Sequence, residues 1–356
     1  MLNRRLRIWC AWAIPIVFIG LRVSTADEPI LISRPDAFKT LVNPDCSHCI
    51  DEAKRRASDL VATDRVLAWT RGKYEGGAIP YRFFLAPYRV ISDTYGVFVY
   101  DPDAGFARGF EPSLDFAFHG WRNGVMVMKH KDGTLYSTLS GRAFDGPRKG
   151  EQLKPFATLT TQWGPWNAAY TNTVAYKMYE KYQPIELPTA PQADSQASRQ
   201  PADPRWPERA EVIGLSLGDA SRAYRIDDLK QAGGVLRDTF RGLDLVVLYQ
   251  ANTNTAAIYG TNVEGTDPAR TVDLAADPFG DSTDFIDRAS GSRFDIAGRA
   301  VAGTLQGKTL RWLPSVQCFW FAWAAEYPQT EIYVQAPGKA RPTAGSASKE
   351  PASKKN

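Results

Sequence analysis

The segments SGRAFDGPRKGEQL (140–153) and AGRAVAGTLQGKTL (297–310) share one pattern of glycines, arginine and leucine. Identical residues recur 157 positions apart, as Gly141, Arg142, Ala143, Gly146, Gly150 and Leu153 in the first segment and Gly298, Arg299, Ala300, Gly303, Gly307 and Leu310 in the second. Glycines at fixed offsets indicate turns, so the two segments indicate one structural unit that is used twice.

The likeness extends on both sides of these segments. Downstream, the residues that recur at the same offset are Trp166, Ala168, Tyr170 and Thr173, matched by Trp323, Ala325, Tyr327 and Thr330. Upstream, VISDTY (90–95) corresponds to VLRDTF (235–240). We therefore predict a tandem duplication of a unit of about 120 residues, with unit 1 at 64–183 and unit 2 at 209–336.

Most apolar segments in both units are short, rich in aromatic or β-branched residues, and bounded by Gly, Pro, Asp or Asn. Examples are GVFVYDPD (96–103), LDFAFHGW (114–121) and LDLVVLY (243–249). This composition is typical of strands, whereas helical patterns are few and include 46–60 and 319–327. The predicted fold class is mainly β with a few helices (α+β), arranged as two similar sandwich- or barrel-like units.

The N-terminus has the features of a secretory signal peptide over residues 1–26. Three arginines precede an apolar run at 8–21, and Ser24-Thr25-Ala26 resembles a cleavage site. The run of about 14 residues is shorter than the roughly 20 that a permanent transmembrane helix needs. We therefore expect an exported protein, periplasmic or extracellular, with no permanent membrane span after cleavage.

The composition outside the units predicts the remaining organisation. An N-terminal segment (27–63) carries a cysteine motif, residues 184–208 have the Pro/Ala/Ser/Gln-rich composition of a linker, and 337–356 resemble a disordered tail. Removing the four arginines of residues 1–26 from 43 Lys and Arg leaves 39, against 39 Asp and Glu. A formally neutral mature chain gives no reason to expect a nucleic-acid partner.

Both units share an order of motifs: an apolar strand, Asp-Thr-aromatic, a strand ending in Tyr, Gly-Arg-Ala with spaced glycines, and a Trp-containing segment before Tyr-x-x-Thr. This order resembles the bacterial family catalogued as "domain of unknown function 3179", here in two degenerate copies. The resemblance implies a Tyr-Cys-Pro-Leu-Cys run and a His-Glu pair, which look like a metal or thiol site. Here Asp101-Pro102-Asp103-Ala104 follows Tyr100, and Tyr88-Arg89 replaces the pair. Since unit 2 lacks both features too, no catalytic residue is carried over.

Cys46, His48 and Cys49 lie in NPDCSHCIDEAKRR (43–56), at the start of a predicted helix. A helix N-terminus stabilises thiolate over thiol, which suits a reactive cysteine. Three interpretations stay open: a local Cys46–Cys49 disulfide, a redox-active pair, or a metal site with up to three ligands for zinc or copper.

A second candidate metal site comes from the hairpin around Asn123-Gly124, a dipeptide typical of a two-residue type I′ turn. That register pairs Trp121 with Met126, His119 with Met128 and Ala117 with His130. His119, Met126, Met128 and His130 would then share one face, and thioether with imidazole suits copper. The alternative is that both methionines fill a core against Trp121.

Three further features have structural interpretations that we prefer. Asp101 and Asp103 have the spacing of a calcium loop but lack its later ligands, so a Pro-Asp turn is expected. Cys318 lies among large apolar residues and should be a buried, inert thiol. Arg142 and Arg299 follow glycines in matched turns and should form structural ion pairs.

The repeated tryptophans of the final segments are Trp163, Trp166, Trp320 and Trp323. They could form platforms for sugar stacking, but their spacing of three on a predicted helix is more typical of core. The function that we expect is a non-enzymatic binding or structural module. The alternative is a metal-handling (copper or zinc) or thiol-redox protein that uses Cys46, His48 and Cys49.

Overall fold

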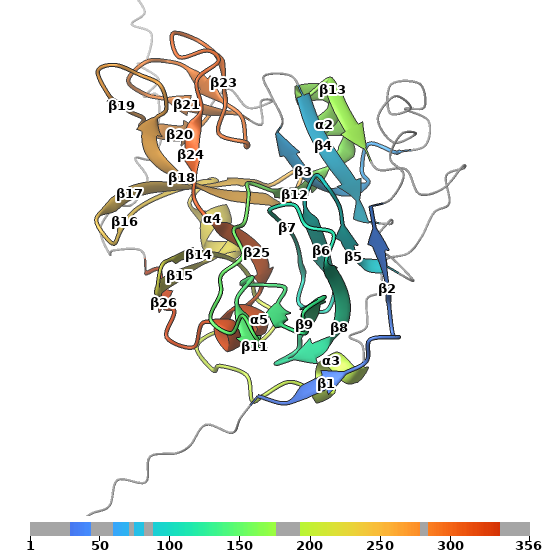
Figure 1. Cartoon of the computed structure of the whole chain (residues 1–356). Coiled ribbons are helices and arrows are strands. Elements are labelled where there is room, and N and C mark those ends of the chain that lie inside the picture. The colour runs from blue at the N-terminus through green and yellow to red at the C-terminus, as the bar shows by residue number, and fades with distance from the viewer. Residues whose placement is uncertain are drawn as a thin grey trace, which may run out of the picture.

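The computed structural model describes residues 29–43, 60–70, 75–81, 88–175, 193–277 and 284–334 (Figure 1). Their secondary structure is mainly β, which confirms the predicted fold class. The helices of these ranges are α2 (Trp163–Ala169), α3 (Ala193–Ala197), α4 (Ile226–Gln231) and α5 (Trp320–Glu326).

The first half of the chain forms three sheets. The first has the order β1 (Leu31–Ser33), β8 (Phe116–Arg122), β9 (Val125–His130), β10 (Leu135–Ser137), β11 (Ala143–Asp145). The second has the order β12 (Leu159–Gln162), β3 (Arg65–Thr70), β4 (Glu75–Pro80), β13 (Asn172–Ala175). The third has the order β2 (Lys39–Val42), β5 (Tyr88–Ser92), β6 (Val97–Asp101), β7 (Phe106–Phe110).

The second half also forms three sheets. One has the order β25 (Ser315–Phe319), β14 (Glu211–Leu217), β15 (Ala220–Arg225), β26 (Glu331–Ile332). Another is β16 (Val235–Phe240), β17 (Leu243–Gln250), β18 (Thr255–Val263), β19 (Arg270–Thr271), with β24 (Leu310–Trp312) also on β18. The last is β20 (Leu274–Ala276), β21 (Phe285–Asp287), β22 (Arg293–Phe294), β23 (Ala300–Ala302).

The two sheets that carry the repeated tryptophan helices have the same topology. In each, an antiparallel hairpin (β3–β4 or β14–β15) is flanked by an antiparallel strand before the helix and a parallel strand after it. Arg65 pairs with Gln162, and Glu211 pairs with Phe319, so the first residues of β3 and β14 hold matching positions. This likeness supports the tandem duplication that we propose.

Each of these sheets, with its helix, packs on the other unit. Trp320 and Trp323 of α5 lie in one core with Phe116 and Met128 of unit 1, and Figure 1 shows α5 (red) beside the green strands β9 and β11. Reciprocally, α2 and its sheet share a core with β17 and β18 of unit 2. We call this arrangement crossed packing. Burying one large apolar side chain contributes about 1.5–3 kcal/mol, so the several that are buried between the units hold them together.

The opposite face of each tryptophan sheet packs within its own unit. Trp69 of β3 stacks on Phe98 of β6 with ring centroids 4.8 Å apart, and Leu215 of β14 shares a core with Val247 of β17. With both faces covered, the run 212–215 is buried throughout and does not alternate between apolar and polar residues.

The described part of the predicted linker is packed against both units. Ser195 of α3 donates a hydrogen bond to the Gly124 carbonyl (3.1 Å), and Ser198 Oγ accepts one from the Gly124 N–H (2.9 Å). Trp206 meets Trp320 edge to face at 4.7 Å. Residues 193–208 therefore form part of the wall between the units.

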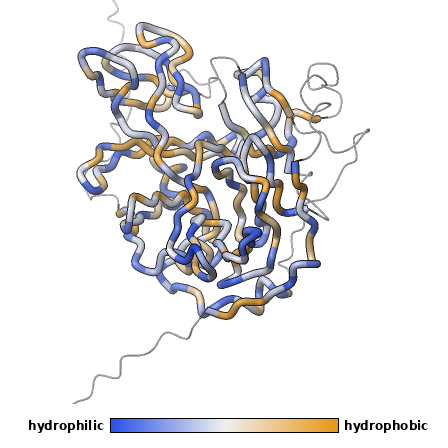
Figure 2. The backbone as a smooth tube through the Cα atoms, in the orientation of Figure 1, coloured by the Kyte–Doolittle hydropathy of each residue, from blue (hydrophilic) through white to orange (hydrophobic). Residues whose placement is uncertain are grey.

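The distribution of hydropathy follows the strands. Figure 2 shows short hydrophobic stretches (orange) along them, interrupted by hydrophilic residues (blue). Within the described ranges, no helix has both the length and the apolar character needed to cross a bilayer.

Candidate functional site

Several predicted features lie outside the described residues. They are the signal peptide (1–26), the motif with Cys46, His48 and Cys49, and the tail (337–356). The disulfide, redox and metal interpretations of that motif therefore stay predictions.

The hairpin that carries the second predicted metal site is present, with a different register. Asn123 and Gly124 have φ of 56° and 76°, as a type I′ turn requires, and Trp121 pairs with Met126 as predicted. A register shift between Phe118 and Gly120 then makes Phe118, not His119, the partner of Met128. The predicted pairing of Ala117 with His130 is wrong for the same reason, since Phe116 takes that place.

This register separates His119 from the other three predicted ligands, which stay at alternate positions of β9. Met126 and Met128 are buried in the core that contains Phe118, and His119 lies on the opposite face of β8, 3.2 Å from the Ser33 hydroxyl. His130 is buried between carboxylates, 3.0 Å from Asp132 and 3.6 Å from Asp115. The methionines thus have the core role given as the alternative to copper binding.

The expected turn at Asp101 is present. Its carboxylate is buried and accepts hydrogen bonds from the backbone N–H groups of Ala104 (3.1 Å) and Met126 (2.8 Å). Burial, with nearby Asp103, raises the pKa of Asp101 to about 7.

The described residues contain no group of three or more His, Cys, Asp or Glu side chains that could hold a metal ion.

The repeated tryptophans are core residues. Trp163, Trp166, Trp320 and Trp323 are 4%, 3%, 0% and 1% exposed, so none can stack on a sugar at the surface. Cys318 is a buried free thiol, as expected, and burial raises its pKa well above the ordinary value. Its thiolate form is therefore disfavoured.

A groove of about 1310 Å³ lies where the units meet. Its walls are the end of β8, the segment around β11, residues 199–204 of the predicted linker and the C-terminal end of α5. We call it the inter-unit groove. It exists only because crossed packing brings α5 beside β11.

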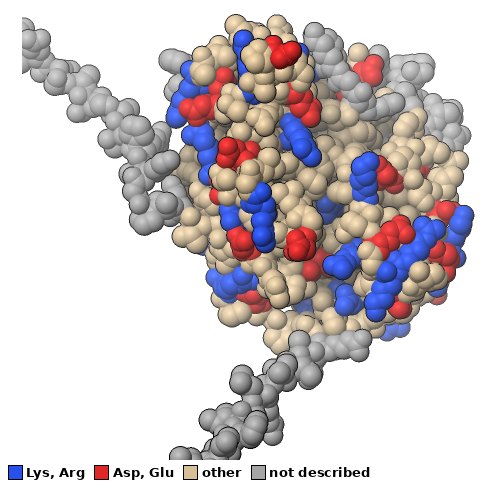
Figure 3. Space-filling model, turned by 60° about the vertical axis from the view of Figure 1, so that its left-hand side comes forward, with Lys and Arg blue, Asp and Glu red and all other residues tan. Residues whose placement is uncertain are grey.

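Four cationic side chains line the inter-unit groove: Arg122, Arg142, Lys149 and Arg199, of which Arg199 pairs with Glu208. Within the described residues none of the first three forms an ion pair with a carboxylate. The Arg122 guanidinium lies over the Phe144 ring at 4.5 Å, which orients it beside an apolar face. Basic and acidic side chains are interspersed on the face that Figure 3 shows.

Most acidic groups of the groove already have partners. Glu326 accepts hydrogen bonds from the hydroxyls of Ser137 (2.9 Å) and Ser140. Glu208 pairs with Arg199, and the carboxylates that complete the lining are Asp203, which pairs with Arg205 at 2.8 Å, and Asp145. Among the described residues, three lining cations without an ion pair therefore stand against two such carboxylates, Asp145 and Glu326, an excess of one positive charge.

Arg142 and Arg299 show how the two units differ here. Arg299 forms the expected structural ion pair, 3.4 Å from Asp295, and stacks over Tyr170. Position 138, which matches Asp295 at the repeat offset of 157, is Thr138, so Arg142 has no such partner and is exposed in the groove. The structural prediction is correct for Arg299 and wrong for Arg142. The sequence shows that Arg142 lacks the counterpart of Asp295, but it does not show that Arg142 lies in a groove.

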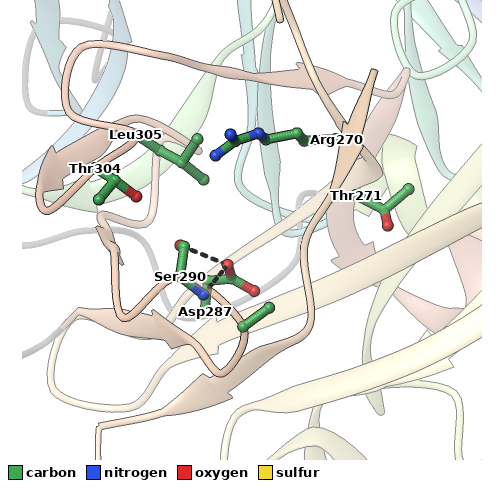
Figure 4. Close-up of a pocket in the computed structure, with 7 residues that line it drawn as sticks. Arg270, Thr271, Asp287, Ser290, Thr304 and Leu305 are labelled. Carbon is green, nitrogen blue, oxygen red and sulfur yellow. Dashed lines mark hydrogen bonds between the residues drawn. The ribbon is translucent and has the colours of Figure 1, made fainter. Parts of the chain in front are cut away.

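A smaller pocket of about 490 Å³ lies beside β19 and β21 (Figure 4). Its buried Asp287 accepts hydrogen bonds from Ser290 Oγ (2.6 Å), Ser290 N (3.0 Å) and Asp273 N (2.7 Å). Because both carboxylate oxygens already hold this turn together, we assign Asp287 a structural role.

Comparison with known proteins gives a family and no activity. The sequence model described as "Protein of unknown function (DUF3179)" matches residues 96–330, a single span through both units, so the chain belongs to this family. Because the match is one span, it does not show two tandem copies of the family's domain. No curated protein and no solved structure matches the chain.

Proposed function

We propose that this member of the DUF3179 family is an exported, non-enzymatic binding protein whose ligand occupies the inter-unit groove. The ligand is an extended molecule that carries carboxylate or phosphate groups. The observation that carries the proposal is the set of unpaired cations Arg122, Arg142 and Lys149 along one groove.

The charge and the size of the groove both suit an extended anionic ligand. Arginine side chains recognise planar anionic groups through paired hydrogen bonds, and a partly enclosed site strengthens these bonds relative to water. The volume of about 1310 Å³ exceeds the usual 300–1,000 Å³ of small-molecule pockets, which suits an extended ligand. Phe144 and Phe321 add apolar surface to the same walls.

The test uses the mature chain and fluorescently labelled probes of equal length: hexaglutamate and hexagalacturonate as anions, and hexalysine as the cationic control. Fluorescence anisotropy at low and high salt measures binding. We expect at least one anionic probe to bind, hexalysine not to bind, and salt to weaken the binding by screening.

The double variant Arg142→Glu/Lys149→Glu should reduce the affinity about tenfold or more. The matched control is Arg270→Glu/Arg311→Glu, which changes two exposed arginines outside the groove and should bind like the wild type. Equal binding of hexalysine and the anionic probes, or unchanged binding by the groove variant, would refute the proposal.

The alternative function, metal handling or thiol redox chemistry, depends on the sequence of Cys46, His48 and Cys49. Elemental analysis and thiol counting on the mature protein from its native compartment separate it from the first proposal. Stoichiometric copper or zinc that is lost in Cys46→Ser/Cys49→Ser would support it, whereas a metal-free protein with an inert disulfide would exclude it.

A further inference from the structure

A third cavity, of about 170 Å³, lies where strand ends from the two units converge. Unit 1 contributes Arg65 from the start of β3 and two tyrosines, Tyr81 and Tyr100. Unit 2 contributes Glu211 from the start of β14 and Asn254 from the turn between β17 and β18. We call it the central cavity; it is distinct from the inter-unit groove.

The central cavity contains one cation and one anion that are not paired with each other. Arg65 donates a hydrogen bond to the Thr253 carbonyl (3.0 Å), and Glu211 accepts one from Asn254 Nδ2 (3.2 Å). Neither side chain forms an ion pair with any residue in the described part of the chain. Both side chains can therefore form further hydrogen bonds and ion pairs with a ligand.

The fold holds these charges apart. Arg65 and Glu211 occupy matching positions, each the first residue of its hairpin and each opposite the residue that precedes a tryptophan helix. Because each belongs to a different sheet, their backbone positions are fixed independently. A ligand with two opposite charges can therefore bridge them without first breaking an internal ion pair.

The other walls limit the size of the guest. Tyr81 and Tyr100 are 7% and 5% exposed, their rings lie 4.5 Å apart, and the Tyr81 hydroxyl is fixed 2.5 Å from Thr160 Oγ1. At about 30 Å³ for each water molecule, the cavity volume of about 170 Å³ corresponds to about six waters. Alanine has about that many non-hydrogen atoms.

We infer that the central cavity is a binding site for a small zwitterion, an α-amino acid with a short side chain. Arg65 binds its carboxylate, Glu211 binds its ammonium group, and the tyrosine rings limit its side chain. This inference is independent of the groove, because it uses different residues and a ligand of different charge and size.

The first test uses the wild-type mature protein and isothermal titration calorimetry with alanine, propionate and ethylamine. The last two compounds each lack one of the charges. A site that needs both charges should bind alanine about tenfold or more tightly than either analogue. N-acetylalanine, which keeps the carboxylate but not the ammonium charge, should also bind weakly.

The second test uses Arg65→Gln and Glu211→Gln, each expected to weaken alanine binding about tenfold or more. Arg270→Gln, outside the cavity, is the matched control and should bind as the wild type does. Thermal unfolding of every variant shows whether it is folded. No binding of alanine to the wild type, equal binding of propionate or ethylamine, or unchanged binding by both folded variants would overturn the inference.

Discussion

Gly214 of β14 offers a direct test of how α5 packs on its sheet. A Cβ atom at this position would lie 2.3 Å from two carbons of the Trp323 ring, whereas ordinary contacts are 3.4–4 Å. The ring would have to move by about 1 Å in a close-packed interior. It is fixed by a hydrogen bond from Nε1 to Thr330 Oγ1 (2.9 Å) and by Tyr327, whose ring centroid is 4.3 Å away.

We therefore expect Gly214→Ala to lower the free energy of unfolding by about 1–3 kcal/mol, the usual cost of overpacking a core. For a chain of this size that corresponds to a fall in Tm of several degrees. Urea unfolding of the mature protein, followed by tryptophan fluorescence and circular dichroism, gives the free energy.

The matched control is Gly260→Ala in β18. Gly260 is also buried in a strand, but the nearest atom to its added Cβ is the Arg311 carbonyl oxygen at 3.9 Å. The stability of the Gly260→Ala variant should be unchanged or rise by about 0.4–1 kcal/mol, because alanine reduces the conformational entropy of the unfolded chain. If Gly214→Ala were as stable as Gly260→Ala, the packing of Trp323 against β14 would be disproved.

Three further predictions concern buried side chains. The pKa of Asp101 is about 7 in the folded protein and 3.8 in the unfolded chain, so its protonation stabilises the fold fully below pH 3.8, and this contribution is lost as the pH rises through 7. The free energy of unfolding, measured in urea, should therefore fall by about 2–3 kcal/mol between pH 5 and pH 8, and Asp101→Asn should reduce this fall. An equal fall in both proteins would contradict the assignment. Met128→Ala should cost about 2–5 kcal/mol and Met128→Leu less than about 1.5 kcal/mol, whereas a neutral alanine variant would contradict the core role. In a Cys46→Ser/Cys49→Ser background, Cys318 should react with a thiol reagent only in urea, and rapid reaction of the folded protein would contradict its burial.

The sequence predicts local structure well where the cause is local. Asn123-Gly124 predicts its turn because both residues tolerate positive φ, and the Trp121–Met126 pair follows directly from that turn. The register fails at His119 because β1 approaches there: Gly120 pairs with Ser33, and a Cβ atom on Gly120 would lie 2.0 Å from the Ile32 carbonyl oxygen. A contact with a segment so distant in sequence leaves no periodic signal within the hairpin.

The candidate sites depend on tertiary structure in the same way. Apolar patterns show which residues of the repeated helices are buried, but not that α5 is buried against unit 1. Arg142 and Phe321 come from different units, and so do Arg65 and Glu211. Each site combines residues that only crossed packing brings together, so composition and spacing could not predict either one.

Crossed packing also constrains the order in which a newly made chain can mature. The core formed by β6, β8 and β9 includes residues 316–324, which a ribosome adds some 190 residues after the end of β9. Until those residues emerge, Phe116, Trp121 and Met128 remain without their final neighbours. Contacts so distant in sequence also favour slow folding. We therefore expect the nascent first half to stay incompletely folded during synthesis, a state that would suit the export that we propose.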